Sequence, residues 1–201
     1  MFQILSAPNL GRKTRIESME RGTYNHHLLN YEKQVGLFIN HLGFKESSND
    51  WTVMNSINCL GEWQFAYPTL IKLGYKYITP KKFKGNPSIF PRELQLTVLK
   101  QLIEINEYSL RPYDGYIGTT INGIKITKGG LLAGMHLGGL GAIKSFLLSE
   151  GYVNKEDRNG TSISDYIKEF SIYNLFRYTT LEDFRNEHYI KFLYDENGIR
   201  R

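Results

Sequence analysis

Apolar residues recur at helical spacing in several stretches of the chain. The clearest stretch begins after Pro91, where apolar residues three and four positions apart form a single stripe. Gly43 stands where the first stretch would end, and Gly138-Gly139 interrupts a later one. The stretches predicted to be helical are residues 31–42, 68–73, 92–105, 128–149 and 163–170. The pattern therefore predicts a fold built mainly from helices.

One short segment departs from the helical period. Ile121 and Ile124 flank Asn122-Gly123, which is a strong signal for a two-residue β-hairpin turn. Thr127 follows and is expected to cap the next helix. The expected fold class is thus mainly α (α+β), with one small β-hairpin.

Polar, glycine and proline residues set the expected domain boundaries. Residues 1–28 contain one proline and two glycines among many polar residues, and we interpret them as an irregular N-terminal leader. Residues 29–175 are expected to form one domain, in which the lysine-rich segment 75–90 is a surface loop. Residues 176–201 are aromatic and amphipathic, which indicates a C-terminal helical extension.

The composition allows a sizeable core and gives a modest positive charge. Of the 201 residues, 41% are apolar, which is enough for one domain of this length. Lys and Arg number 25 against 20 Asp and Glu, and this balance suits an anionic partner such as nucleic acid, a cell-wall polymer or a membrane surface. The basic residues are scattered and no aromatic RNA-binding motif accompanies them, so nucleic acid is not the partner we expect.

Cysteine and histidine usage bears on cofactors and redox chemistry. Cys59 is the only cysteine, which excludes an intramolecular disulfide. A nucleophilic cysteine needs a histidine as its base, and the sequence around Cys59 contains none. The chain has no CxxC or HExxH motif, so we expect no metal and no other cofactor. No apolar run approaches the roughly 18 residues of a membrane span, and the N-terminus lacks the order of a secretory signal. We therefore expect synthesis in the cytoplasm and no membrane span.

Motifs of distinctive composition follow one another along the chain. They are residues 46–55 (ESSNDWTVMN), 60–65 (LGEWQF), 131–143 (LLAGMHLGGLGAI) and 159–162 (NGTS) with Tyr166. Their order resembles the lysozyme-like superfamily, especially its soluble lytic transglycosylase and goose-type lysozyme branch. The LGEWQF segment and the NGTS ending are most similar to a bacterial and phage subgroup that cleaves peptidoglycan.

This resemblance implies a lysozyme-like helical catalytic domain and an enzyme that cuts the bond between N-acetylmuramic acid and N-acetylglucosamine. Glu46 takes the place of the single general acid and base. A carboxylic acid donates a proton near neutral pH only if its pKa is raised, which burial beside apolar rings achieves. The residues that the resemblance places at the substrate are Ser47, Trp51, Trp63, Gln64, His136 and Tyr166. Among these, Tyr166 corresponds to a tyrosine whose hydroxyl points toward the catalytic glutamate.

Alternatives stay open at several of these positions. Glu62 is the alternative acid, and we expect it on the rim of the cleft, exposed and ionised. Gln64 can equally brace a turn, His136 can be a helix residue near a bend, and Tyr166 can belong to the core. The segment Met135-His136-Leu137-Gly138 departs from the Tyr-Asn-Ala-Gly of the family, which leaves the contacts on that wall open.

The reaction type depends on whether a second carboxylate takes part. The usual glycosidase uses two carboxylates, and none is an obvious partner for Glu46, since Asp50 is only four residues away and Asp114 falls in a loop. This favours a lytic transglycosylase, in which the sugar's own 6-hydroxyl attacks, although hydrolysis remains open. The alternative function is a non-catalytic cell-wall glycan-binding module of the same fold.

The expected partner is a peptidoglycan glycan strand. Without an export signal, such an enzyme would reach the periplasm or the extracellular cell wall after lysis or through dedicated secretion, as a phage enzyme or a secretion-system effector does. A carrier or immunity protein would then be a second partner.

Overall fold

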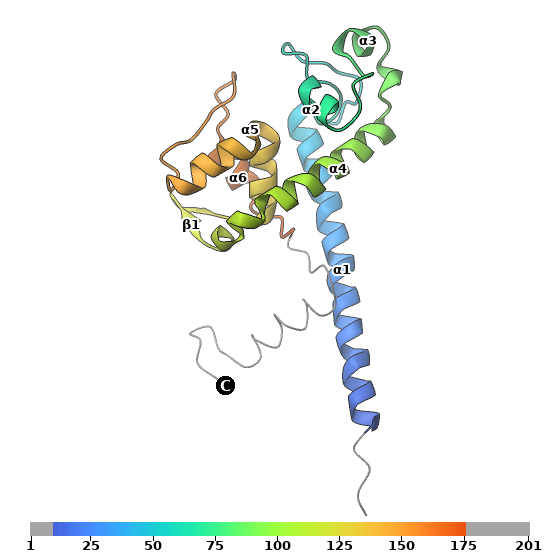
Figure 1. The fold of residues 1–201 in the computed structure, drawn as a ribbon, viewed down its shortest axis with the longest axis vertical. Coiled ribbons are helices and arrows are strands. Elements are labelled where there is room, and N and C mark those ends of the chain that lie inside the picture. Colours follow the sequence, from blue (N-terminus) through green and yellow to red (C-terminus); the bar gives the residue numbers. More distant parts are fainter. Residues whose placement is uncertain (1–9, 176–201) are drawn as a thin grey trace, which may run out of the picture. The chain divides into compact units, whose positions relative to one another are not determined.

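The structure of the protein is a computed structural model that describes residues 10–175 (Figure 1). Contacts between residues divide the chain into two units, of which one is formed by residues 34–175 and the other by residues 1–33 with 176–201. The first boundary falls a few residues after the predicted one at residue 29. The helical extension predicted for residues 176–201 lies outside the described residues. The fold is mainly helical with one small antiparallel hairpin, as predicted.

Helix α1 (Leu10–Ser47) corrects the predicted leader, because the described part of residues 1–28 is helical rather than irregular. No proline follows Pro8 until after the helix has ended, so nothing in this stretch removes a backbone donor. Gly43 does not end the helix either. A Cβ at this glycine would lie 2.7 Å from Oδ1 of Asn49, so the residue is needed for close packing.

Residues 67–116 of the larger unit contain three α-helices and two short 3-10 helices. Their bounds are α2 (Tyr67–Lys72), α3 (Pro80–Gly85), η1 (Pro87–Ile89), α4 (Arg92–Leu110) and η2 (Arg111–Tyr116). The predicted surface loop over residues 75–90 is wrong, because α3 and η1 lie within it. Ile78, Phe83 and Phe90 from this segment are completely buried, so its few apolar residues anchor it to the core while its lysines remain exposed.

The predicted hairpin is confirmed. Strand β1 (Thr120–Ile121) pairs antiparallel with β2 (Ile124–Lys125). Asn122 and Gly123 occupy the turn with φ of 49° and 76°, the left-handed conformations that a two-residue turn of this kind requires.

Helices α5 (Lys128–Leu148) and α6 (Ile163–Phe170) pack against each other. Thr127 caps α5 by accepting a hydrogen bond from the backbone N–H of Gly130, as predicted. Gly130 also allows close approach, since a Cβ there would lie 2.6 Å from the backbone oxygen of Ile167. The predicted break is at Gly139, whose φ of 72° and ψ of 176° interrupt the helix.

Helix α5 also has the length and apolar character of a membrane-spanning segment, and within residues 10–175 no second helix does. Half of this stretch is buried inside the protein, as is common for a core helix. In Figure 1, α4 runs between the region of α2 and α3 and the region of α5, α6 and the hairpin. The site described below lies within this unit.

Candidate active site

A cavity of about 1170 Å³ opens in the unit formed by residues 34–175. Its wall combines the end of α1, the loop around Cys59, one face of α2 and α4, the break in α5, and the loop that leads into α6. These segments are far apart in the sequence, so the cavity exists only in the folded domain. Its volume is that of a site for a sizeable ligand.

Glu46 lies in this wall, in the last turn of α1. Its side chain is 15% exposed, and the hydroxyl of Tyr166 donates a hydrogen bond of 2.7 Å to its Oε1. The pKa of Tyr166 is raised, first by burial and then by the negative charge of Glu46. Tyr166 therefore keeps its proton and acts as a permanent donor to the carboxyl group, and its predicted orientation toward Glu46 is confirmed.

His136, on α5, lies near the same carboxylate oxygen of Glu46. Its Nε2 is 2.8 Å from the backbone oxygen of Trp63 and 3.9 Å from Oε1 of Glu46. Because a carbonyl oxygen only accepts, Nε2 must carry the hydrogen and donate it. His136 thus lines the cavity and is also held to the turn that precedes α2.

Ionic contacts and hydrogen bonds connect Lys45, which lies over the ring of Tyr166, to α6. The Nζ atom of Lys45 lies 4.8 Å from the centre of the Tyr166 ring and 2.6 Å from Oε2 of Glu169. The other oxygen of Glu169 is 3.0 Å from Nε2 of His41, whose Nδ1 is 3.0 Å from the hydroxyl of Tyr173. This chain of contacts joins the end of α1 to α6 immediately behind the cavity.

Glu62 is not where the sequence places it. The prediction of an exposed residue on the rim is wrong, since Glu62 is completely buried and is absent from the cavity wall. Both of its oxygens accept from the guanidinium of Arg92, at 2.6 and 2.9 Å. The φ of 75° at Gly61 turns the chain here, and Gln95 accepts from the backbone N–H of Glu62 at 2.7 Å. Glu62 is therefore a structural ion-pair partner of α4.

The two tryptophans also lie outside the cavity wall. Trp63 is completely buried and donates its Nε1–H to the backbone oxygen of Ile39 at 2.9 Å. It has no exposed surface for a substrate, which corrects its predicted role. Trp51 is partly exposed but does not line the cavity, and its backbone oxygen accepts from Gln95.

Ser47 belongs to the loop architecture next to Glu46 and is not part of the cavity wall. Its hydroxyl donates to the backbone oxygen of Glu62 at 2.8 Å and accepts from the backbone N–H of Asp50 at 3.0 Å. Ser47 therefore fixes the turn after α1 against the turn that contains Glu62. It does not face a bound ligand.

Gln64 braces a turn, which was one of its two predicted roles, and it also lines the cavity. Its Nε2 donates to the backbone oxygen of Gly61 at 2.7 Å. Its Oε1 is buried and has no hydrogen-bond partner within the described chain. An acceptor in this state is available to a ligand donor, because buried polar atoms are otherwise paired.

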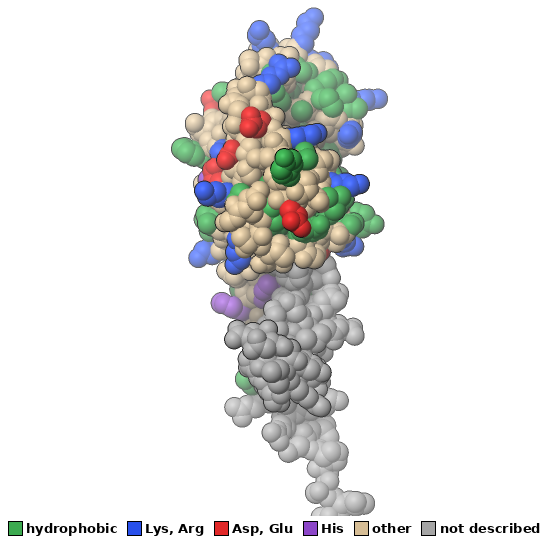
Figure 2. All heavy atoms as spheres, turned by 90° about the vertical axis from the view of Figure 1, so that its left-hand side faces the viewer, with side chains coloured by type: hydrophobic (Ala, Val, Ile, Leu, Met, Phe, Trp, Pro, Cys, Tyr) green, Lys and Arg blue, Asp and Glu red, His purple; other side chains and the backbone are tan. Residues whose placement is uncertain are grey.

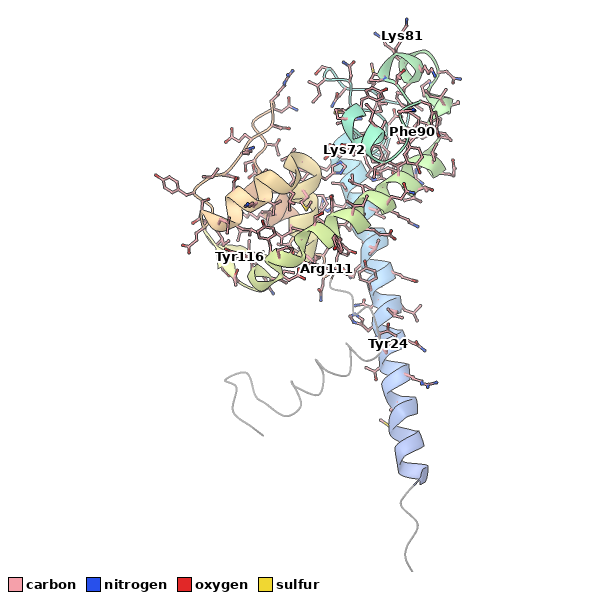
Figure 3. All side chains as sticks on the ribbon, in the orientation of Figure 1. Tyr24, Lys72, Lys81, Phe90, Arg111 and Tyr116 are labelled. Carbon is pink, nitrogen blue, oxygen red and sulfur yellow. The ribbon has the colours of Figure 1, made fainter. Side chains whose placement is uncertain are left out.

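Four charged cavity residues were not predicted from the sequence, and Lys45, described above, is one of them. Lys72 lies at the end of α2 (Figure 3). Neither Lys72 nor Arg158 forms an ion pair with another described residue. Asp157 also lines the cavity, but its Oδ1 accepts from the backbone N–H groups of Asn159 and Thr161, both at 2.8 Å. Nothing in the local sequence distinguishes these residues from solvated loop residues, so only the tertiary structure identifies them.

The remaining acids considered as a second carboxylate have other partners. Asp50 accepts from the backbone and hydroxyl of Thr52, which lowers its pKa, and Asp114 pairs with Lys128. Neither lines the cavity. Within residues 10–175 there is also no group of three or more His, Cys, Asp or Glu side chains that could hold a metal ion.

The arrangement has one clear chemical capacity. Glu46 is a mostly buried carboxyl group with one oxygen held by a neutral hydroxyl donor, beside an open cavity. Such a group can deliver a proton to a bound ligand and take one back. Comparisons with protein-family models, with curated proteins and with solved structures found no match for this chain.

Proposed function

We propose that the protein is a peptidoglycan-cleaving enzyme in which Glu46 is the general acid and then the general base. The observation that carries the proposal is the placement of this carboxyl group in the wall of a large cavity, with Tyr166 bonded to it. The order of the sequence motifs supports the same role for Glu46. The bond cut is the one between N-acetylmuramic acid and N-acetylglucosamine.

The cavity wall suits an amide- and hydroxyl-bearing polymer with negative charges. The amide nitrogen of Asn55 can donate, since its Oδ1 already accepts from two backbone N–H groups, and the Oε1 of Gln64 can accept. Together with the amide of Asn106 they offer hydrogen bonds of both kinds, as sugar hydroxyls and N-acetyl groups require. Lys72 and Arg158 are cations without a partner in the described residues. Peptidoglycan carries carboxylates on its stem peptides, whereas a plain N-acetylglucosamine polymer carries none.

The reaction proposed is the intramolecular one. Asp157 is the other carboxylate in the cavity wall, and one of its oxygens is occupied by its own turn. With no clearly free second carboxylate, Glu46 protonates the leaving oxygen, and its carboxylate then takes the proton of the 6-hydroxyl as the anhydro ring closes. Hydrolysis by a water molecule is the competing outcome.

Clearing of purified cell walls by the wild type and by Glu46→Gln tests the proposal. We expect the variant to lose about 100-fold or more of the activity, because a general acid contributes at least that much. Glu104→Gln is the matched control, since Glu104 is exposed on α4 and lies outside the cavity wall. Equal clearing by wild type and Glu46→Gln would remove Glu46 from the mechanism.

Mass spectrometry of the digested wall separates the two reactions. Anhydro-muramic ends lack one water relative to reducing ends, so the intramolecular reaction and hydrolysis give different masses. On this proposal, the enzyme acts in the periplasm or on the extracellular cell wall. A phage or secretion-system origin, with a carrier or immunity protein as partner, is part of the same proposal.

The proposal includes no nucleic-acid partner and no membrane span. Figure 2 shows Lys and Arg side chains spread along both edges of the face that it presents, with Asp and Glu between them. Such mixed charge does not form the continuous basic surface that nucleic-acid binding uses.

A non-catalytic wall-binding module is the second candidate. It is favoured by His136, which takes part in a hydrogen bond to the backbone of Trp63 at the wall where the sequence departs from the related family. Sedimentation with cell walls, without release of soluble muropeptides by the wild type, would support this candidate over the enzyme.

A further inference from the structure

We propose that Glu169 is a positioning residue that keeps the ammonium group of Lys45 away from the catalytic carboxyl group of Glu46. The inference rests on the proposed function of Glu46. It concerns a contact behind the cavity that the mechanism above does not use. If the ammonium group of Lys45 reached Glu46, it would lower the activity of the catalytic acid. The ion pair with Glu169 holds the ammonium group elsewhere.

Lys45 and Glu46 both lie next to Tyr166. Both residues line the same cavity, and the Nζ of Lys45 lies 4.8 Å from the centre of the Tyr166 ring. The hydroxyl of that ring is bonded to Glu46 at 2.7 Å. Adjacent helix residues do not face each other, but the four-carbon stem of lysine gives its ammonium group a wide reach. An ammonium group on the carboxylate would hold it ionised, and an ionised carboxylate has no proton to give.

Glu169 holds this ammonium group in another place. Its Oε2 is 2.6 Å from Nζ of Lys45, and both side chains are about one-quarter to one-third exposed, at 24% and 35%. Its Oε1 is 3.0 Å from Nε2 of His41, so both carboxylate oxygens are engaged. The ring of His41 stacks on Phe170 with a centroid distance of 4.4 Å. Glu169 is therefore anchored from a second side and does not simply follow Lys45.

The position of Lys45 over the Tyr166 ring has a second consequence. The cation–π contact and the stacking of Phe170 on Tyr166, at 5.9 Å between centroids, hold the ring from two directions. The hydroxyl of Tyr166 then stays directed at Glu46. The ion pair between Lys45 and Glu169 thus keeps the ammonium group away from Glu46. It also holds that group over the ring of Tyr166, whose hydroxyl donates to Glu46.

A set of three variants tests the inference. Glu169→Gln removes the negative charge and leaves Lys45 free, and we expect wall clearing to fall by about fivefold, the effect of one new partly exposed ion pair. Lys45→Met removes the ammonium group and keeps much of the apolar stem, and we expect a smaller loss. The double variant is expected to clear walls faster than Glu169→Gln alone, since no ammonium group remains to reach Glu46.

A purely structural ion pair would also give non-additive effects, because residues in direct contact are coupled. The free energies of unfolding of the four proteins are therefore measured beside clearing, and the inference requires that clearing recovers in the double variant by more than its stability does. Additive losses, or unchanged clearing by Glu169→Gln, would overturn the inference. Lys168→Met is the matched control on α6, because Lys168 is exposed and lies outside the cavity wall. We expect it to behave as the wild type.

A crystal structure of Glu169→Gln gives a readout that does not depend on activity. We expect Nζ of Lys45 within 4 Å of the Glu46 carboxylate in that variant, and its continued position over the Tyr166 ring would overturn the inference. Failure of the wild type to clear walls would instead count against the proposed function. The two outcomes are therefore distinguishable.

Discussion

The hydroxyl of Tyr166 donates to Oε1 of Glu46 at 2.7 Å, and this hydrogen bond joins α6 to the last turn of α1. Tyr166→Phe removes the donor and leaves the ring. The carboxyl group of Glu46 would no longer be held in one orientation, and misplacement of a catalytic group is costly, so we expect wall clearing to fall by about 10- to 100-fold. Initial rates of turbidity loss measure this effect.

The control for this change is Tyr152→Phe, because Tyr152 is 93% exposed and lies outside the cavity wall. Circular dichroism and thermal unfolding should show both variants folded. If Tyr166→Phe clears walls as fast as the control, the hydroxyl has no part in holding the acid.

The free cations of the cavity predict a preference for strands that carry stem peptides. Lys72→Gln and Arg158→Gln should each weaken binding to intact peptidoglycan by about two- to fivefold, because exposed ion pairs contribute little individually. Oligomers of plain N-acetylglucosamine, which carry no carboxylate, should bind the wild type and the variants equally. Sedimentation in a Glu46→Gln background measures binding without cleavage.

Two lysines of α3 supply the matched control for that charge change. Figure 3 shows Lys81 projecting outward from α3, and neither Lys81 nor Lys84 lines the cavity. Their double replacement by Gln removes the same net charge as the double variant Lys72→Gln/Arg158→Gln. A loss of binding equal to that of the cavity variants would show that only overall charge matters.

Local signals in the sequence were sufficient for much of the fold. Thr127 was expected to cap a helix, and it is the N-cap of α5. Asn122-Gly123 forms the expected turn. These features depend on a few neighbouring residues, whose hydrogen bonds and φ preferences do not need the rest of the chain.

Features that depend on distant partners could not be predicted in this way. In the sequence, Glu62 cannot be distinguished from an exposed acidic residue. Its partner Arg92 is 30 residues later and contacts it only because of the position of α4. Lys45 and Glu169 are 124 residues apart, and their pairing has no signature in the sequence. The orientation of Tyr166 was available only because the resemblance supplied it.

The capping box of α6 makes a specific prediction about pH. Asp165 accepts from the hydroxyl and the backbone N–H of Ser162, at 2.6 and 2.9 Å, and these bonds lower its pKa below the ordinary 3.8. A lowered folded-state pKa gives stability that is present above pH 3.8 and is lost as the pH falls through the folded value. Asp165→Asn should therefore be less stable than the wild type at pH 7, by about 0.5–1 kcal/mol for the exposed third residue of a capping box.

Urea unfolding at pH 7, 5 and 3 measures this difference in the free energy of unfolding. The gap between wild type and Asp165→Asn should be constant from pH 7 to 5 and narrow toward pH 3. Glu104→Gln should show no such narrowing, because Glu104 is exposed on α4 and its side chain forms no hydrogen bond with another described residue. A gap that widens with acid would contradict the proposed role of the cap.

The break in α5 gives the last prediction, because Gly139 and Gly141 differ in backbone conformation and not in available space. A Cβ at either glycine would meet no atom within 4 Å. Gly139 has φ of 72° and ψ of 176°, a region used almost only by glycine, and it lines the cavity. Gly139→Ala should therefore cost about 1–3 kcal/mol of stability and also slow wall clearing, since the backbone of the cavity wall must shift.

Gly141→Ala should be neutral or stabilising by up to about 1 kcal/mol, because alanine is favoured in a helix. Thermal unfolding and clearing rates of the two variants check both statements, and equal behaviour of the pair would show that the break does not shape the site.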